Sequence, residues 1–327
     1  MRTTKAVAAL LATVLCLAAL VGCRAVRPAD DRTVVKLGGE EVVYDYFRYV
    51  FMNCKRDIEA GDKEYWTKNG EEGLKTLRAE ILTVLRRNGA ILSLAKEHKI
   101  SLTGEEKKEI RALIDAAKKE LGREEYQASL EESFLTEYML IYVQELTAIW
   151  DKLYTYVTSE QSGLIEADDA TIEADIPKSF RRIRYVFIEK DGEDDEEAKR
   201  TAEDVLAKAL AGDDFDQLIE DYGEDETMEA VLDDGYYYTL SSIHEEMEKA
   251  VEALAENEIR TELLELPFGY FIVERLPLDE GYINENFEDF RTEYCARIFN
   301  NMLNDRALSL DVEYTDLFYT LTVDAMS

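Results

Sequence analysis

The residues of this chain that could do chemistry do not show the ligand spacing of a known metal site. The only histidines are His98 and His244, and neither has further nitrogen or thiolate ligands at the spacing of a zinc site. The acidic run Asp191–Glu197 could attract Ca²⁺, but it lacks the spacing of an EF-hand. We therefore expect no metal and no cofactor, with His98 at a solvated helix end and His244 an ordinary first-turn residue.

The most informative segment of the chain is instead residues 180–277. It begins with the β-rich run Arg182–Ile188, and a helical pattern follows over Glu196–Ala211. A second short helix is predicted within Gly212–Asp225, and the segment ends in a hairpin-like run, Leu266–Glu274. This order predicts a small domain with both helices and strands.

These motifs resemble the parvulin family of prolyl isomerases. That family has a histidine in its first strand, a helix pair reading G-x-D-F…L…Y-S-E-D, and a last hairpin reading F-G-Y-H-I-I. The matching residues here are Gly212 to Phe215, Tyr222 to Asp225, and Phe268 to Phe271. The resemblance implies the element order β-α-α-β-α-β-β and a cleft that binds Xaa-Pro peptides.

Prolyl isomerisation requires neither a nucleophile nor a cofactor, because the barrier of about 18–20 kcal/mol is rotation about a partial double bond. A catalyst holds the proline ring in an apolar pocket and favours the twisted amide. In parvulins, a hydrogen-bonded pair of histidines and a nearby Cys or Asp form the polar side of this cleft.

The resemblance assigns the catalytic positions to Tyr185, Phe271 and Asp225. Tyr185 and Phe271 stand where the family has its two histidines, whereas Asp225 agrees with the family's Cys or Asp. A phenol can donate a hydrogen bond, but a phenylalanine cannot complete the relay. We therefore expect isomerase activity to be weak or lost.

The resemblance also implies a substrate-binding set. Ile243 and Met247 stand at the proline-pocket positions, and Asp234 stands where an apolar residue is usual. Tyr236, the first residue of a Tyr-Tyr-Tyr run, could line a peptide cleft, although alternate residues of a strand would also serve as core. Ser242 to Glu245 has the spacing of a capping box at a helix start.

The first 22 residues have the features of an export signal. Arg2 and Lys5 precede the apolar run Ala6–Leu20, which is shorter than the roughly 20 residues of a spanning helix. Leu20 to Cys23 resembles a bacterial lipoprotein box, so we expect Cys23 to be the lipidated N-terminus. The alternative is a plain secretory signal with a chance cysteine. Residues 23–32 would form a short tether to the cell membrane, on its extracytoplasmic face.

The flanking segments predict helices at about 71–98, 104–121, 135–158 and 287–308, with a polar connector over 159–179. At the start of the mature chain, two short strand-like runs flank a turn at Gly38 and Gly39, and apolar residues from Val43 to Phe51 form a helical stripe. Further on, Thr103 and Glu106 have the spacing of a capping box. The first of these segments resembles the start of the PrsA and SurA family of extracytoplasmic foldases.

This second resemblance implies an α+β fold. Residues 33–179 and 278–327 would form a discontinuous helical chaperone core, and the parvulin-like domain would be inserted between them. It would also bring the helices of Cys54 and Cys295 into one domain, which leaves two alternatives, a disulfide and two buried free thiols.

The chain is strongly acidic, with a formal net charge of −33. This sign argues against nucleic acid or an anionic bilayer surface as the binding partner. It favours solubility and, more weakly, cationic or unfolded basic clients, and the alternative is that the acidic side chains solvate long helices. The leading hypothesis is a membrane-anchored foldase that acts on unfolded exported polypeptides. The alternatives are a holdase without catalysis and, less favoured, a solute-binding lipoprotein, a class that is built on repeated βαβ units.

Overall fold

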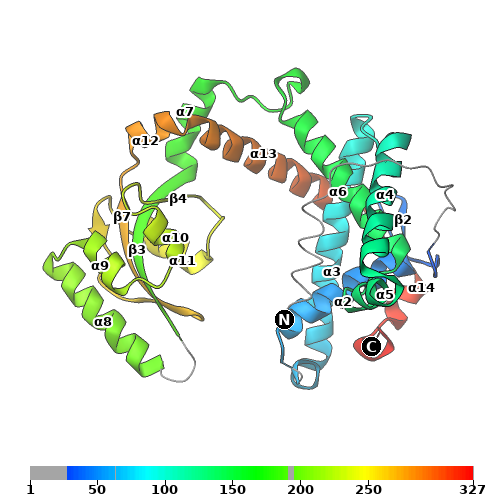
Figure 1. Cartoon of the computed structure of the whole chain (residues 1–327), viewed down its shortest axis with the longest axis horizontal. Helices are drawn as coiled ribbons and strands as arrows, with labels where there is room; N and C mark the ends of the chain where they lie inside the picture. Colours follow the sequence, from blue (N-terminus) through cyan, green and yellow to red (C-terminus); the bar gives the residue numbers. More distant parts are fainter. Residues whose placement is uncertain (1–27, 63, 191–194, 327) are drawn as a thin grey trace. The chain divides into compact units, whose positions relative to one another are not determined.

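The computed structural model describes residues 28–62, 64–190 and 195–326, which form two compact units (Figure 1). The helical unit comprises Met1–Ile165 and Ile298–Ser327, and the sheet unit comprises Glu166–Arg297. The segment predicted to be an export signal, the predicted lipidation site Cys23 and residues 191–194 of the acidic run lie outside the described residues. Within the described ranges, no helix is both long and apolar enough to cross a bilayer.

The helical unit contains a small antiparallel sheet in the order β2-β1-β8. Its described elements are β1 (Thr33–Leu37), β2 (Glu40–Val43), α2 (Tyr44–Glu59), α3 (Tyr65–Glu97), α4 (Gly104–Leu121), α5 (Arg123–Glu132), α6 (Glu137–Val157), η1 (Glu160–Ser162), β8 (Val312–Tyr314), α14 (Asp316–Thr320) and α15 (Val323–Met326).

Sequence patterning accounts for most of this unit. Gly38 and Gly39 take positive φ angles of 54° and 85° in the predicted hairpin turn. The stripe of α2 places Phe47 and Phe51 in a core with Leu77 and Met139. Helix α5 was not predicted, and α3 starts earlier than expected, with a kink at Gly70.

The predicted capping box at the start of α4 is present. The Thr103 side chain accepts from the Glu106 N–H at 3.2 Å, and Glu106 accepts from the Thr103 N–H at 2.6 Å. The Glu106 carboxylate also binds the Lys152 ammonium at 2.7 Å, which ties α4 to α6. Hydrogen bonds from Lys152 and Thr103 lower the pKa of Glu106 to about 2.

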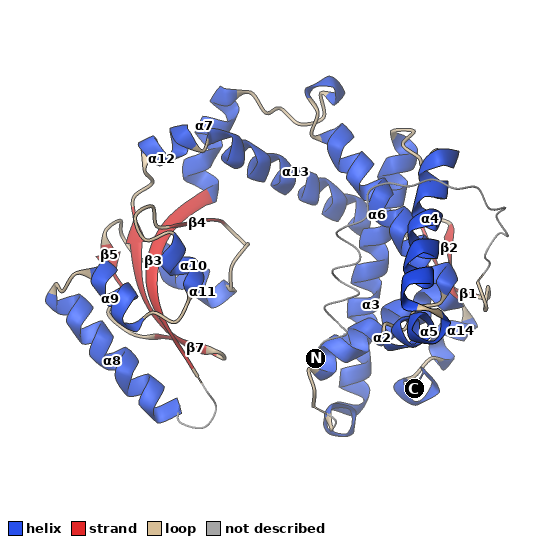
Figure 2. Cartoon of the chain, viewed as in Figure 1, coloured by secondary structure: helices blue, strands red, loops and turns tan. Residues whose placement is uncertain are grey.

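The sheet unit contains a five-stranded antiparallel sheet in the order β4-β3-β7-β5, with β6 also paired to β7 (Figure 2). Its described elements are α7 (Asp169–Ser179), β3 (Phe180–Glu189), α8 (Asp195–Ala211), α9 (Phe215–Tyr222), α10 (Glu226–Ala230), β4 (Tyr236–Thr239), α11 (Glu245–Glu252), β5 (Glu258–Ile259), β6 (Leu264–Leu266), β7 (Gly269–Leu276) and α12 (Glu280–Glu285). Helix α13 (Phe287–Ser309) begins in this unit and ends in the helical unit.

The two faces of this sheet bury different residues because side chains alternate along each strand. Val186 and Ile188 of β3 pack with α8 and α9. Ile183 of β3 packs with Met247 and Val251 of α11. The α+β class is confirmed, and the order matches the expected β-α-α-β-α-β-β apart from the short elements α10 and β5.

The prediction of a polar connector over residues 159–179 is wrong, because helix α7 occupies the second half of this segment. Asp168 caps this helix by accepting from the Thr171 N–H at 3.1 Å, and Ile172 and Ile176 bury one face. Pro177 lies inside the last turn of α7, three residues before β3 begins.

The division into units also separates the two cysteines. Cys54 lies on α2 of the helical unit, whereas Cys295 lies in the part of α13 that belongs to the sheet unit. That part of α13 packs on α7 and β3, because Arg297 binds Asp175 and Phe290 contacts Phe180. Both thiols are buried and free in the structure, without a disulfide.

Candidate functional site

The functional site predicted from the parvulin resemblance contains one direct polar contact. Tyr185 on β3 donates its phenolic hydrogen to Oδ2 of Asp225, with 2.6 Å between the oxygens. The other carboxylate oxygen of Asp225 accepts from the Thr227 N–H at 2.9 Å, which makes Asp225 the N-cap of α10. Both residues are therefore held in fixed positions.

The loop after α9 places Asp225 beside β3. The Glu224 N–H donates to the Phe187 carbonyl at 3.0 Å. In return, the Glu189 N–H donates to the Glu224 carboxylate at 2.6 Å. These two bonds fix the loop along the strand, so the next residue, Asp225, faces Tyr185.

The electrostatics of the pair favour a neutral phenol and a charged carboxylate. Burial and the hydrogen bond to Asp225 raise the pKa of Tyr185 above its usual value. Burial acts to raise the pKa of Asp225, but the hydrogen bonds from Tyr185 and Thr227 outweigh it and lower that pKa. At neutral pH the phenol donates its only hydrogen to the carboxylate, and none is left for a substrate amide.

Phe271 lies next to this pair but adds no polar group. It is opposite Phe187 in the β3–β7 register, and the ring centroids of these two residues are 4.7 Å apart. The Tyr185 and Phe271 centroids are 5.5 Å apart. The structure thus brings the two family histidine positions together, but they meet through rings rather than through a hydrogen bond.

The rings of Tyr185, Phe187 and Phe271 form an aromatic cluster. The expected pocket residues lie around this cluster, with one exception. Met247 of α11 is buried in one cluster with Phe271, and Ile243 and Tyr236 are partly buried against it. Asp234 is exposed in the turn before β4, where its backbone carbonyl accepts from Arg182 Nε at 2.6 Å. Its carboxylate is not part of the apolar cluster.

Sequence reasoning missed two members of the aromatic cluster. Phe187 is two residues after Tyr185 and therefore on the same face of the strand, a signal that could have identified it. Phe268, in the β6–β7 turn, has its ring centroid 5.8 Å from that of Phe271 and is 49% exposed. It is the most exposed ring of the cluster.

The two histidines take part in local helix capping and ring packing. The predicted capping box at Ser242 is wrong, because His244 is the N-cap of α11 and its Nδ1 accepts from the Glu246 N–H at 3.3 Å. His98 follows α3 and packs its ring 5.4 Å from Tyr156. In the described part of the chain, no group of three His, Cys, Asp or Glu side chains could hold a metal ion.

Comparison with known proteins adds independent evidence. Residues 175–276 match the family described as the PPIC-type PPIASE domain. The foldase protein PrsA of Caldanaerobacter subterraneus subsp. tengcongensis is 22% identical over 307 residues, which cover 92% of this chain and 89% of that protein.

Solved structures of similar proteins include PrsA of Streptococcus pneumoniae, which is 18% identical. The match covers 79% of this chain and 94% of that chain, with a TM-score of 0.36. A chain from a study of SurA-like chaperones of Campylobacter jejuni is 13% identical, with coverage of 87% and 99% and a TM-score of 0.32. Both scores are below 0.5. By the sequence matches, residues 175–276 are similar to the PPIC-type PPIase domain family, and the chain over most of its length is similar to the foldase protein PrsA.

Proposed function

We propose that this protein is a membrane-anchored, extracytoplasmic folding factor whose isomerase activity is weak or lost. The likeness to PrsA supports a role in folding exported polypeptides. The observation that carries the loss of catalysis is the hydrogen bond between Tyr185 and Asp225, with Phe271 as their nearest ring. The anchor would be a lipid on Cys23, with the protein on the outer face of the cell membrane.

The chemistry of the twisted amide supports this proposal. Rotation about the Xaa-Pro bond breaks amide resonance, so a catalyst must interact better with the twisted form than with the planar one. The Tyr185 hydroxyl is already bound to a carboxylate, and Phe271 offers only a ring. Neither side chain can therefore donate a hydrogen bond that stabilises the twisted amide over the planar one.

A second function, holding clients without catalysis, is favoured by two apolar features. In the sheet unit, Phe268 exposes half of its surface beside the site. In the helical unit, a cavity of about 370 Å³ lies between α2, α3 and α6 and is lined by apolar residues that include Val50, Val84, Ile91, Val143, Leu146 and Trp150. Its size fits one large side chain of an unfolded chain.

The solute-binding alternative has less support. Every strand pairing in the described residues is antiparallel. A βαβ unit requires parallel strands joined by a crossover.

Measurement of chaperone activity separates the two leading functions. Tyr185→Phe, Asp225→Asn and Phe271→Leu would be compared with the unchanged chain for suppression of aggregation of a denatured protein. Unchanged suppression by all three variants is expected if the parvulin fold serves only to bind clients. A loss of suppression in Tyr185→Phe or Asp225→Asn, with folding intact, would overturn the holdase version.

A further inference from the structure

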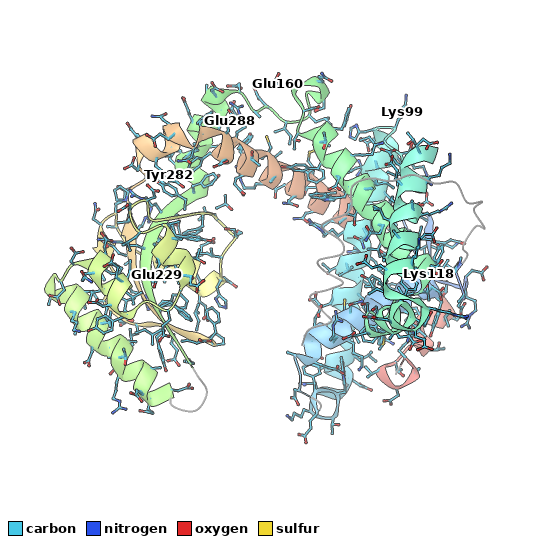
Figure 3. All side chains as sticks on the ribbon, in the orientation of Figure 1. Lys99, Lys118, Glu160, Glu229, Tyr282 and Glu288 are labelled. Carbon is cyan, nitrogen blue, oxygen red and sulfur yellow. The ribbon has the colours of Figure 1, made fainter. Side chains whose placement is uncertain are left out.

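A second cavity lies in the sheet unit, and Tyr236 is the one residue of its lining that also belongs to the parvulin-type site. Its volume is about 390 Å³, within the range of ligand sites. It is formed by strand β4, helix α12 and the first turns of α13, and Figure 3 shows Tyr282 of α12 on the side facing β4. The comparisons and the proposed function leave this cavity without a role.

Aromatic rings build one wall of this cavity. Tyr237 of β4 stacks on Tyr282, with centroids 4.4 Å apart and planes 8° from parallel. Phe290 of α13 meets Tyr237 edge-on at 5.7 Å and Phe180 at 4.8 Å. The rings therefore pack against one another and form a continuous aromatic wall.

Two carboxylates face the same cavity without a cation. Asp289 and Glu293 are exposed one helical turn apart on α13, where like charges repel. Within the described residues, neither the Asp289 nor the Glu293 carboxylate forms an ion pair. The arginines in this part of α13 bind carboxylates of α7 instead. Arg291 binds Asp169 and Arg297 binds Asp175, both on α7.

The residues that line this cavity are aromatic, polar or acidic, and none of them is basic. A cation is therefore the group that this wall would hold best, with its charge against the carboxylates and its stem against the rings. The aromatic wall of this cavity already contacts one cation, since the Arg182 guanidinium lies 5.6 Å from the Tyr237 centroid.

Strand β4 supplies the second half of a peptide site. Among the described strands it pairs only with β3, so it forms an edge of the sheet. Its outer edge therefore presents backbone groups to which an extended peptide can add as a further strand. The cavity lies directly beside this edge, because Tyr236, Tyr237, Tyr238 and Thr239 all line it.

We propose that the cavity beside β4 binds an extended, basic segment of polypeptide. The main chain of the segment lies along the outer edge of β4, and a Lys or Arg side chain enters the cavity to meet Asp289 and Glu293. This site is separate from Tyr185 and Asp225, so the inference holds whether or not the function proposed above is correct.

The test is an NMR titration of the purified, isotope-labelled chain with two short peptides. They differ only in a central residue, lysine in one and its uncharged analogue norleucine in the other. We expect the lysine peptide to bind about tenfold more tightly, with shifts centred on Thr239 and Tyr282. Equal affinities, or shifts centred on Tyr185, would overturn the proposal.

A pair of charge-matched variants completes the test. Asp289→Asn with Glu293→Gln removes both cavity carboxylates, whereas Glu173→Gln with Glu203→Gln removes two exposed carboxylates elsewhere in the sheet unit. The first variant should lose the tenfold preference for lysine, and the second should keep it. Equal losses would show a long-range effect of net charge and would refute a local site. Neither result depends on isomerase activity.

Discussion

Among single residues, the Tyr185 hydroxyl should make a measurable contribution to the stability of the sheet unit. Its hydroxyl donates to Asp225, and a hydrogen bond to a charged group contributes about 1.5–3 kcal/mol. Tyr185→Phe should therefore lower the free energy of unfolding of the sheet unit by about 2 kcal/mol, as measured by urea denaturation.

The matched control is Tyr236→Phe, which removes the same atom from a ring 6.5 Å away. No hydrogen bond to the Tyr236 hydroxyl occurs within the described residues, so this change should cost less than about 0.5 kcal/mol. Equal effects of the two substitutions would show that the bond to Asp225 contributes nothing.

The same pair predicts a dependence of stability on pH. The pKa of Asp225 is lower in the folded chain than its usual value, so the bond stabilises the fold fully above that usual value, about 3.9. This contribution is lost as the pH falls through the folded pKa. The difference in unfolding free energy between the unchanged chain and Asp225→Asn should be constant from pH 7 to pH 5. It should then shrink toward pH 3, and a difference that grows on acidification would contradict the assignment.

At the scale of elements, β7 approaches β3 so closely at Gly269 that no side chain fits at this position of the last hairpin. A Cβ on Gly269 would lie 2.3 Å from the Phe187 ring and 2.5 Å from the Ile188 carbonyl oxygen. Gly269→Ala should therefore destabilise the sheet unit by about 1–3 kcal/mol or more. Gly104→Ala is the control, because nothing lies within 4 Å of its added carbon. Calorimetry of both variants checks the prediction, which equal melting temperatures would refute.

The N-terminus of α4 gives a second prediction at this scale. Thr103→Ala removes the side chain that caps the helix, and such changes cost about 1 kcal/mol. Thr83→Ala is the matched control, since Thr83 lies on the exposed surface of α3 and, among the described residues, its hydroxyl bonds only to the Ala79 carbonyl of its own helix. Alanine has the higher helix propensity, so the control should be neutral or slightly stabilising in chemical denaturation. A larger loss in the control would contradict the capping role.

Local sequence signals predicted those elements whose information is contained in neighbouring residues. The glycine pair of the first hairpin, the capping box at Thr103 and the stripe of α2 belong to this class. Helix α7 was missed because its core contacts, Ile172 and Ile176, are embedded in a run of polar residues. The contact between Tyr185 and Asp225 joins residues 40 positions apart, and only the family resemblance suggested it.

The cavity beside β4 could not be predicted from local patterns at all. It forms because α12 and α13 return to β4 after the last strand, which brings Tyr282 onto Tyr237. The Tyr-Tyr-Tyr run was noticed as a candidate cleft wall, but the carboxylates that complete the cavity come from a helix about 50 positions later.

At the scale of the whole molecule, the division into two units predicts two unfolding transitions. Thr103→Ala should shift only the transition of the helical unit, and Tyr185→Phe only that of the sheet unit. Differential scanning calorimetry of the two single variants and the double variant checks this, with additive shifts expected. A single transition that moves with either substitution would show that the units unfold together.

The central claim is that the parvulin-type domain has the family fold without the family's efficient catalysis. The most direct test is NMR exchange spectroscopy on Xaa-Pro peptides with the purified chain, since uncatalysed exchange takes about 10–100 s. We expect little or no acceleration by the unchanged chain, and faster exchange after Tyr185→His with Phe271→His, which restores the two family histidines. Strong acceleration by the unchanged chain that Asp225→Asn abolishes would contradict the claim, because the Tyr185–Asp225 pair would then itself be the catalyst.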